Sequence, residues 1–269
     1  MRRANLVVGG TLIAVILLVA LVGLFWTPFS PTAISGPRLA PPGWPHVLGT
    51  DGQGSDMASR IISGAKLALL VGVISVSAAA LIGVPVGIIA GMSHRFVAAV
   101  LSRGADILYG FPALLLAILF AAAVGGSTWT AVAAIGIATI PVFVRIVRAA
   151  TLQVMSQTFV EAARLSATPP LQVAWRHVLP NIAPVLGVQA SVSFGLAILA
   201  EAGLSYLGLG SGSDVPTWGR MLREAQNEMF NAPLVALWPG LAIAMATMGF
   251  NLLGDGLRDL LDPKLREIA

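Results

Sequence analysis

Cysteine is absent from the 269 residues of this chain, and charged residues make up only 10% of them. The lack of cysteine excludes disulfides, thiolate metal sites and a cysteine nucleophile. A soluble domain carries roughly 25% charged residues, so this chain has too few polar groups to cover a globular surface. Hydrophobic residues make up 57% and the mean hydropathy is +0.86, which also excludes a disordered chain. The composition is that of a polytopic membrane protein.

Sequence motifs of enzymes and nucleotide-binding proteins are missing as well. The chain has two lysines, Lys66 and Lys264, and neither follows a glycine, so there is no phosphate-binding loop of the G-x-x-x-x-G-K-[ST] type. The H-E-x-x-H and G-x-S-x-G motifs are absent. The three histidines, His46, His94 and His177, are too scattered to suggest a metal site. We therefore expect that this chain is not an enzyme and binds no metal or cofactor by itself.

Uncharged runs divide the chain into segments of membrane-spanning length. A helix needs about 20 apolar residues to cross the hydrocarbon core. The run 107–144 is too long for one helix, and Gly125-Gly126-Ser127-Thr128 in its middle is a turn signal. We expect six transmembrane helices, at about residues 6–26, 67–92, 104–124, 129–149, 182–204 and 235–256. The first is longer than the apolar part of a signal peptide, so we expect it to be retained as an anchor.

The basic residues predict the orientation of these spans. With the N-terminus in the cytoplasm, eleven of the sixteen lysines and arginines fall in cytoplasmic segments and five in external ones. This bias agrees with the positive-inside rule. Because the number of spans is even, the two termini share a side. We expect both of them to be cytoplasmic.

The cytoplasmic segment 150–181 is the most informative part of the sequence. Connections between helices usually run a few residues, whereas this one has about thirty. A helical pattern over residues 159–165 is broken by Thr168-Pro169-Pro170, and a second helix is expected over 171–178 before Pro180.

Three residues of this segment favour contact with another protein. Glu161 lies near the N-terminus of its predicted helix, where a carboxylate interacts favourably with the helix dipole. Ala162 and Ala163 are small, so a partner can approach their backbone closely. On physical grounds alone, the segment is either a docking element or an interfacial helix that only joins two spans.

Small and polar residues within the spans carry two further predictions. Gly83, Gly87 and Gly91 form one stripe on the second span, which predicts close packing of another helix rather than substrate contact. Pro85 in the second span and Pro112 in the third indicate kinks. Glu201 near the outer end of the fifth span is compatible with a functional or an interfacial structural role, and we favour the structural one.

Four ordered motifs cover nearly the whole chain. They are Glu161-Ala162-Ala163 followed by 176–181, Leu48-Gly49-Thr50-Asp51 with Asp56, the segment 201–210 with Trp218-Gly219, and the C-terminal segment 251–263. Together they resemble the permease subunits of bacterial ABC importers of the dipeptide, oligopeptide and nickel type, in which the first motif is the "EAA" loop.

This resemblance implies an all-α membrane protein with a cytoplasmic coupling loop at 150–181. It implies contact with an ATPase through Glu161, Ala162, Ala163, Arg164, Leu165 and Ala167, and an external loop motif made of Gly49, Thr50, Asp51 and Asp56. The family pattern has glycine where this chain has Ala167, which leaves the exit geometry of the loop open. The implied division is an N-terminal span with an external segment, 1–65, and a permease core, 66–269.

The resemblance also implies partners and a location. The partners are a homologous second permease, two ABC ATPase subunits or one fused ATPase, and an extracytoplasmic substrate-binding protein. The location is the bacterial plasma (inner) membrane, surrounded by lipid, with no nucleic acid partner. ATP and magnesium would be bound by the ATPases.

Peptides are the expected cargo, although the sequence does not identify the residues that bind them. A nickel-chelate permease of the same family is one alternative. The other is a stand-alone ion-coupled secondary transporter, which would be expected to carry buried acids or an inverted repeat.

Overall fold

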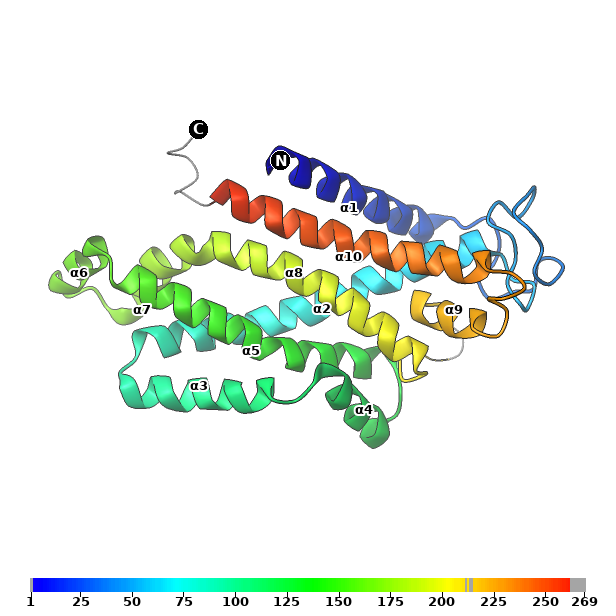
Figure 1. Cartoon of the computed structure of the whole chain (residues 1–269). Coiled ribbons are helices and arrows are strands. Elements are labelled where there is room, and N and C mark those ends of the chain that lie inside the picture. Colours follow the sequence, from blue (N-terminus) through cyan, green and yellow to red (C-terminus); the bar gives the residue numbers. More distant parts are fainter. Residues whose placement is uncertain (1, 211, 213–214, 262–269) are drawn as a thin grey trace.

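A computed structural model describes residues 2–210, 212 and 215–261 as a bundle of long helices (Figure 1). The predicted all-α fold is confirmed, because these residues form no strand and only two isolated bridges, both within 34–56. The helices are α1 (Arg2–Phe25), α2 (Met57–Met92), α3 (Arg95–Tyr109), α4 (Ala113–Val124), α5 (Thr128–Met155), α6 (Thr158–Leu165), α7 (Pro170–Val173), a π-helical turn (Ala174–Val178), α8 (Leu179–Tyr206), α9 (Trp218–Ala225) and α10 (Leu234–Leu261). The end of the C-terminal motif, from Asp262 onward, lies outside the described residues.

Five helical segments of the described chain are long and apolar enough to cross a membrane. They are Ala4–Phe25, Met57–Met92, Thr128–Met155, Pro170–Tyr206 and Leu234–Leu260. α3 and α4 pass the same test only together, and they meet at a bend of 79°. The prediction of about six spans is confirmed when this pair is counted as one. The prediction of a single helix over 104–124 is wrong.

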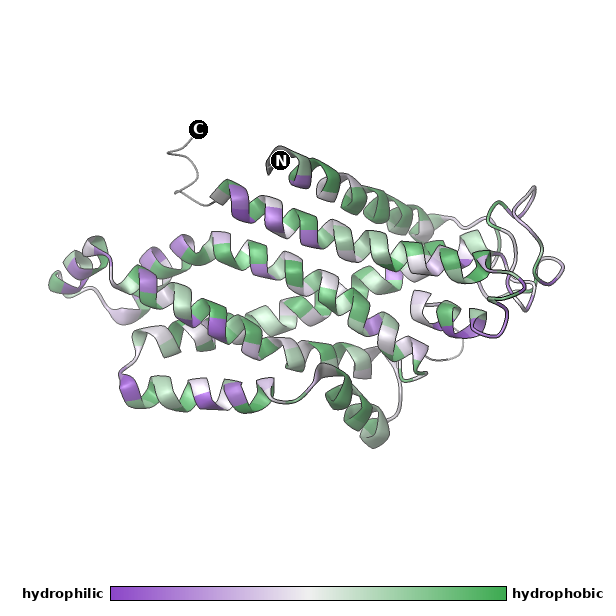
Figure 2. Cartoon of the chain, viewed as in Figure 1, coloured by the Kyte–Doolittle hydropathy of each residue, from purple (hydrophilic) through white to green (hydrophobic). Residues whose placement is uncertain are grey.

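The third span breaks at Gly110-Phe111-Pro112, just before α4 begins. Proline disfavours the helical conformation of the residue before it, so Phe111 cannot easily continue α3. The two halves also differ in character: hydrophobic residues cover α4, whereas α3 carries Arg95, Arg103 and Asp106 (Figure 2). The uncharged run 107–144 indicated apolar helices but not the change of direction between α3 and α4.

At two places where the sequence predicted a helix boundary, the structure has a helix that continues through it. α2 begins at Met57 rather than 67, because the Asp56 carboxylate caps it by accepting from the Ser59 amide at 2.8 Å. α8 continues from α7, although a helix end was expected before Pro180. A π-helical turn precedes this proline, in which the Leu179 amide donates to the Ala174 carbonyl five residues earlier. The wider turn accommodates a residue that has no amide hydrogen.

The buried core consists of three clusters along the bundle. One joins α1 to α2, α8, α9 and α10, and a second joins α2, α4, α5 and α8. The third, formed by Val147, Val160, Val173, Val178 and Ile182, fixes α6 and α7 to α5 and α8. α6 and α7 lie at one end of the bundle, while α9 and the segment 26–56 lie at the other (Figure 1). We call these the α6 end and the α9 end.

Candidate functional site

A buried valine anchors α6 to the bundle. Val160 is 0% exposed and belongs to the valine-rich cluster of the α6 end. On the rest of this helix, Glu161, Ala162 and Arg164 are exposed, and Ala163 is half-buried. Glu161 lies in the first turn and Arg164 in the last. In these positions each charge interacts favourably with the helix dipole. The structure therefore presents the predicted coupling residues at the surface of a helix that is held from one side.

α6 ends in a Schellman motif centred on Ala167. The Thr168 amide donates to the Ala163 carbonyl at 3.2 Å, and the Ala167 amide donates to the Arg164 carbonyl at 3.0 Å. Ala167 has a φ of +55°, in the left-handed region that favours glycine. Alanine therefore makes the same left-handed turn that glycine would make, at a cost of about 1–2 kcal/mol.

Large apolar side chains are exposed around this turn. Leu165 is 86% exposed, Leu171 81% and Trp175 71%. Leu171 and Trp175 were not among the predicted coupling residues, although apolar residues in a segment that was predicted to be cytoplasmic were a usable signal. Exposed apolar patches are a feature of surfaces that contact other proteins or the membrane. We call residues 158–178 the α6 tip.

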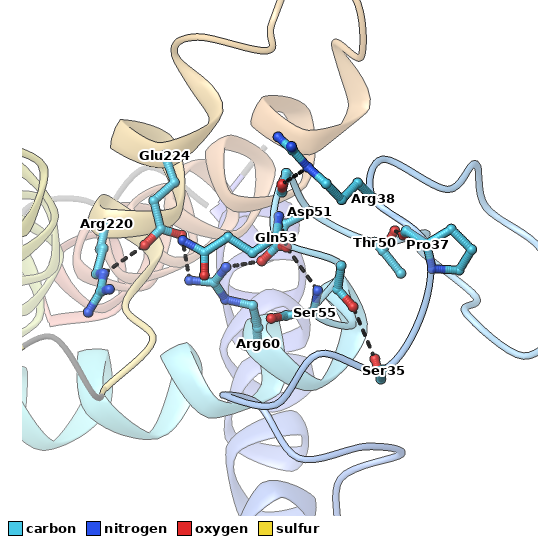
Figure 3. A network of polar contacts seen from close by, with 12 residues as sticks. Ser35, Pro37, Arg38, Thr50, Asp51, Gln53, Ser55, Arg60, Arg220 and Glu224 are labelled. Atoms are coloured by element: carbon cyan, nitrogen blue, oxygen red, sulfur yellow. Dashed lines mark hydrogen bonds and ion pairs between the residues drawn. The ribbon is translucent and has the colours of Figure 1, made fainter.

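At the α9 end, a buried ion network joins three parts of the chain (Figure 3). The Arg60 guanidinium, on the first turns of α2, lies between Asp51 and Glu224. Its contact with Glu224 of α9 is 2.6 Å, and Glu224 also pairs with Arg220 at 2.7 Å. Asp51 is 3% exposed and Arg60 6%. The network ties the segment 26–56 to α2 and α9.

The other residues of the predicted external motif shape the loop around this network. Thr50 is 1% exposed, and its hydroxyl accepts from the Ala40 amide at 2.8 Å. Gly49 has a φ of +79°, and a Cβ there would lie 2.4 Å from the Ala40 carbonyl oxygen, so only glycine fits. Asp56 caps α2 and also contacts His46 Nδ1 at 2.9 Å. The motif thus acts as a scaffold. Sequence reasoning missed Arg60 and Glu224 because their pairing spans 164 positions.

α9 is seated closely on the bundle through Trp218 and Gly219. The Trp218 indole donates to the Ile61 carbonyl at 3.0 Å and covers Gly64. A Cβ on Gly219 would lie 1.9 Å from the carbonyl oxygen of Ala202 in α8. The Trp218-Gly219 motif therefore locks α9 between α2 and α8.

The glycine stripe of α2 faces α5. A Cβ on Gly83, Gly87 or Gly91 would in each case lie 2.6 Å from a Cβ atom of α5, those of Phe143, Val147 and Thr151 respectively. Such distances do not occur between real Cβ atoms. The stripe thus lets α2 and α5 approach closely within this chain.

Glu201 and Asp106 both have partners within the chain. Glu201 is 2% exposed and accepts from the Ser205 hydroxyl, one turn later on α8, at 2.6 Å. Asp106 pairs with Arg145 at 2.8 Å, which joins α3 to α5. Among the described residues, no group of three or more histidines and carboxylates is placed to hold a metal ion.

Together the fold and the α6 tip define a polytopic membrane protein with an exposed helical element at one end. The family model of the binding-protein-dependent transport system inner membrane component matches residues 83–267. The dipeptide transport system permease of Alkalihalophilus pseudofirmus is 41% identical over 85% of this chain and 75% of its own length. The glutathione transport system permease of Pectobacterium atrosepticum is also 41% identical, over 82% of this chain and 73% of its own.

A third relative, the di/tripeptide transport system permease of Pseudomonas aeruginosa, is 40% identical over 86% of this chain and 78% of its own. A solved structure of the inward-facing MetNI methionine ABC transporter has the same fold, with a TM-score of 0.61 at 18% identity. It covers 79% of this chain and 98% of the matched one. The chain belongs to the family of binding-protein-dependent transport system inner membrane components and is a multi-pass inner-membrane protein.

Proposed function

We propose that this chain is a permease subunit of an ATP-driven importer of peptides. The family supports the transport role, and the three relatives named above transport dipeptides, di- and tripeptides, and the tripeptide glutathione. A homologous second permease would complete the path, and a binding protein would deliver the cargo from outside. Because the sequence has no phosphate-binding loop, ATP and magnesium belong to ATPase partners.

The α6 tip is the observation that carries this proposal. It combines a small-residue surface at Ala162 and Ala163 with exposed Leu165, Leu171 and Trp175. An ATPase docked there would cover these apolar groups. The tip therefore lies in the cytoplasm, and so do both termini, since α1 begins and α10 ends toward the α6 end (Figure 1). This orientation agrees with the excess of basic residues in the same segments.

The connections of the α6 tip suggest how movement reaches the membrane. Val160 belongs to the same buried cluster as Val147 of α5 and Ile182 of α8. α7 runs through the π turn into α8 without a break. Closely packed interiors transmit displacement rather than absorb it. When the ATPases close on ATP, displacement of the tip would therefore shift α5 and α8 together. In this scheme, residues 66–269 form the moving permease core, and 1–65 form an anchor with an external segment.

Two substitutions test the docking role. Ala163→Trp should block close approach of the ATPase. Glu161→Lys should remove any contact of the carboxylate with the partner. Its effect on the helix dipole is only about 0.3–1 kcal/mol, too little to abolish function, so a severe defect indicates a lost partner contact. ATPase recruitment and peptide uptake are measured together, with Gly104→Trp as the control. On α3 that residue has nothing within 4 Å of a Cβ. If both α6 variants recruit ATPase and transport like the control, the docking role is wrong.

A further inference from the structure

One face of α8 is left uncovered in the middle of the bundle. Val185 is 40% exposed, Leu196 56% and Leu199 50%, although α8 packs against α2, α5 and α10. Gln189, half-buried, lies on the same face, four residues after Val185. Steps of three and four residues place these side chains along one line of the helix.

Two hollows flank this face. One, of about 400 Å³, is lined by residues of α4, α5 and α8. The other, of about 700 Å³, is lined by residues of α8, α9 and α10. Leu199 and Gly203 line both, so the hollows adjoin across the uncovered face of α8. Volumes of this size are typical of sites that hold small molecules.

Polar side chains line the smaller hollow at mid-membrane depth. They are Thr139 of α5 with Gln189 and Ser193 of α8. Thr139 follows the first residue of α5 by eleven positions, or about 16 Å along the helix, and the hydrocarbon core is about 30 Å thick. Polar groups at this depth are costly and mark functional positions.

The hydrogen bonds of these polar groups do not hold the helices together. The Gln189 amide donates to Ser193 Oγ at 2.8 Å, and the Thr139 hydroxyl donates to the Ile135 carbonyl at 2.7 Å. Each of these bonds stays within its own helix. The two bonds also use only part of the donor and acceptor capacity of these groups, and the remainder can serve a group that enters the hollow.

We propose that the uncovered face of α8 lines the translocation path and that Gln189, Ser193 and Thr139 bind the peptide groups of the cargo there. This inference rests on the proposed function. Amides and hydroxyls donate and accept hydrogen bonds without charge, so they suit the N–H and C=O groups that all peptides share. The described residues that line the two hollows include none with a charge. Weak neutral contacts let a cargo leave as well as enter.

Because the natural chain contains no cysteine, a single introduced cysteine reports its own surroundings. Gln189→Cys is tested in the assembled importer, with ATPases and binding protein present, using a charged methanethiosulfonate reagent. Leu81→Cys is the control, since Leu81 on α2 is 76% exposed in the chain and lines neither of the two hollows. If this face lines the path, the reagent should modify Gln189→Cys. Alanyl-alanine delivered with the binding protein should slow that reaction. Leu81→Cys, in lipid, should not react.

Uptake measurements separate cargo binding from assembly. Gln189→Leu should raise the KM for alanyl-alanine uptake roughly tenfold, as expected for one lost hydrogen bond of a buried polar group, and Gln189→Asn should recover part of it. ATPase recruitment in the same preparations should match that of the wild type. The inference is overturned if Gln189→Cys is as unreactive as Leu81→Cys with and without ATP, or if Gln189→Leu leaves the KM unchanged. In both cases normal ATPase recruitment would leave the proposed function standing.

Discussion

Ala167 has a backbone conformation that a glycine would adopt at less cost. At a φ of +55°, alanine is strained by about 1–2 kcal/mol, while glycine would lose about 0.4–1 kcal/mol through the entropy of the unfolded chain. We expect Ala167→Gly to stabilise the α6 tip by about 0.5–1 kcal/mol and to preserve transport. Ala167→Val should destabilise it, because a β-branched residue tolerates positive φ poorly. Protection of the Thr168 amide from hydrogen exchange measures both effects. The opposite order of protection would mean that the Schellman turn is absent.

Asp51 neutralises Arg60 in a setting from which water is largely excluded. Asp51→Asn keeps the shape of the side chain but leaves a buried arginine with less compensation. Breaking a buried pair in this way costs about 3–5 kcal/mol. We expect a clear fall in the thermal unfolding temperature of the purified protein. Arg38→Gln is the matched control at the same end, because Arg38 is 71% exposed in its pair with Glu228. An exposed pair contributes less than about 1 kcal/mol. Equal effects of the two variants would contradict the role of the network.

Individual residues differ in how far the sequence could specify them. Asp51 and Glu161 were found because they lie in short contiguous motifs. Arg60, Glu224 and Gln189 were not found, because their roles depend on neighbours far along the chain or on a hollow that forms only when helices pack. For Gln189, a polar residue in an apolar span was an available signal, whereas Arg60 and Glu224 lie among other polar residues and do not stand out.

At the scale of helices, the contact between α2 and α5 depends on the glycine stripe. Gly87→Leu places carbon atoms where Val147 already lies, 2.6 Å from the position of the new Cβ. We expect loss of assembly or transport with normal membrane insertion, because leucine is apolar. Gly10→Leu is the control, since a Cβ at Gly10 on α1 meets nothing within 4 Å. Complex formation on a sizing column and peptide uptake measure the effect. If Gly87→Leu assembles and transports like Gly10→Leu, the close approach of α2 and α5 is not needed.

Apolar length predicted five of the membrane helices because each is a long uncharged run. It failed at α3 and α4, where two helices with different directions share one uncharged stretch. Pro112 gave the position of the break but not its angle, which depends on how α4 packs against α5. Pro180 led to the opposite error, because a helix end was predicted where the helix continues. A proline usually ends a helix, yet here the π turn lets Pro170–Tyr206 continue.

The whole molecule separates two tasks along its length. At the α9 end, the buried ion network and the closely seated α9 fix the loops to the helix ends. At the α6 end, α6 is held by one buried valine and exposes most of its other side chains. α8 connects the two ends and carries the uncovered face between them. A rigid end, an exposed end that we propose as the docking end and a continuous helix between them suit a subunit that is moved by a partner.

Purification in detergent followed by uptake in liposomes tests the central claim most directly. The complex is isolated through a tag on this chain, its other chains are identified, and uptake of labelled alanyl-alanine delivered by the binding protein is measured with and without ATP. The account predicts that a homologous permease and an ABC ATPase co-purify, and that uptake requires ATP. Recovery of this chain alone, with full uptake in liposomes that contain no ATPase, would contradict it.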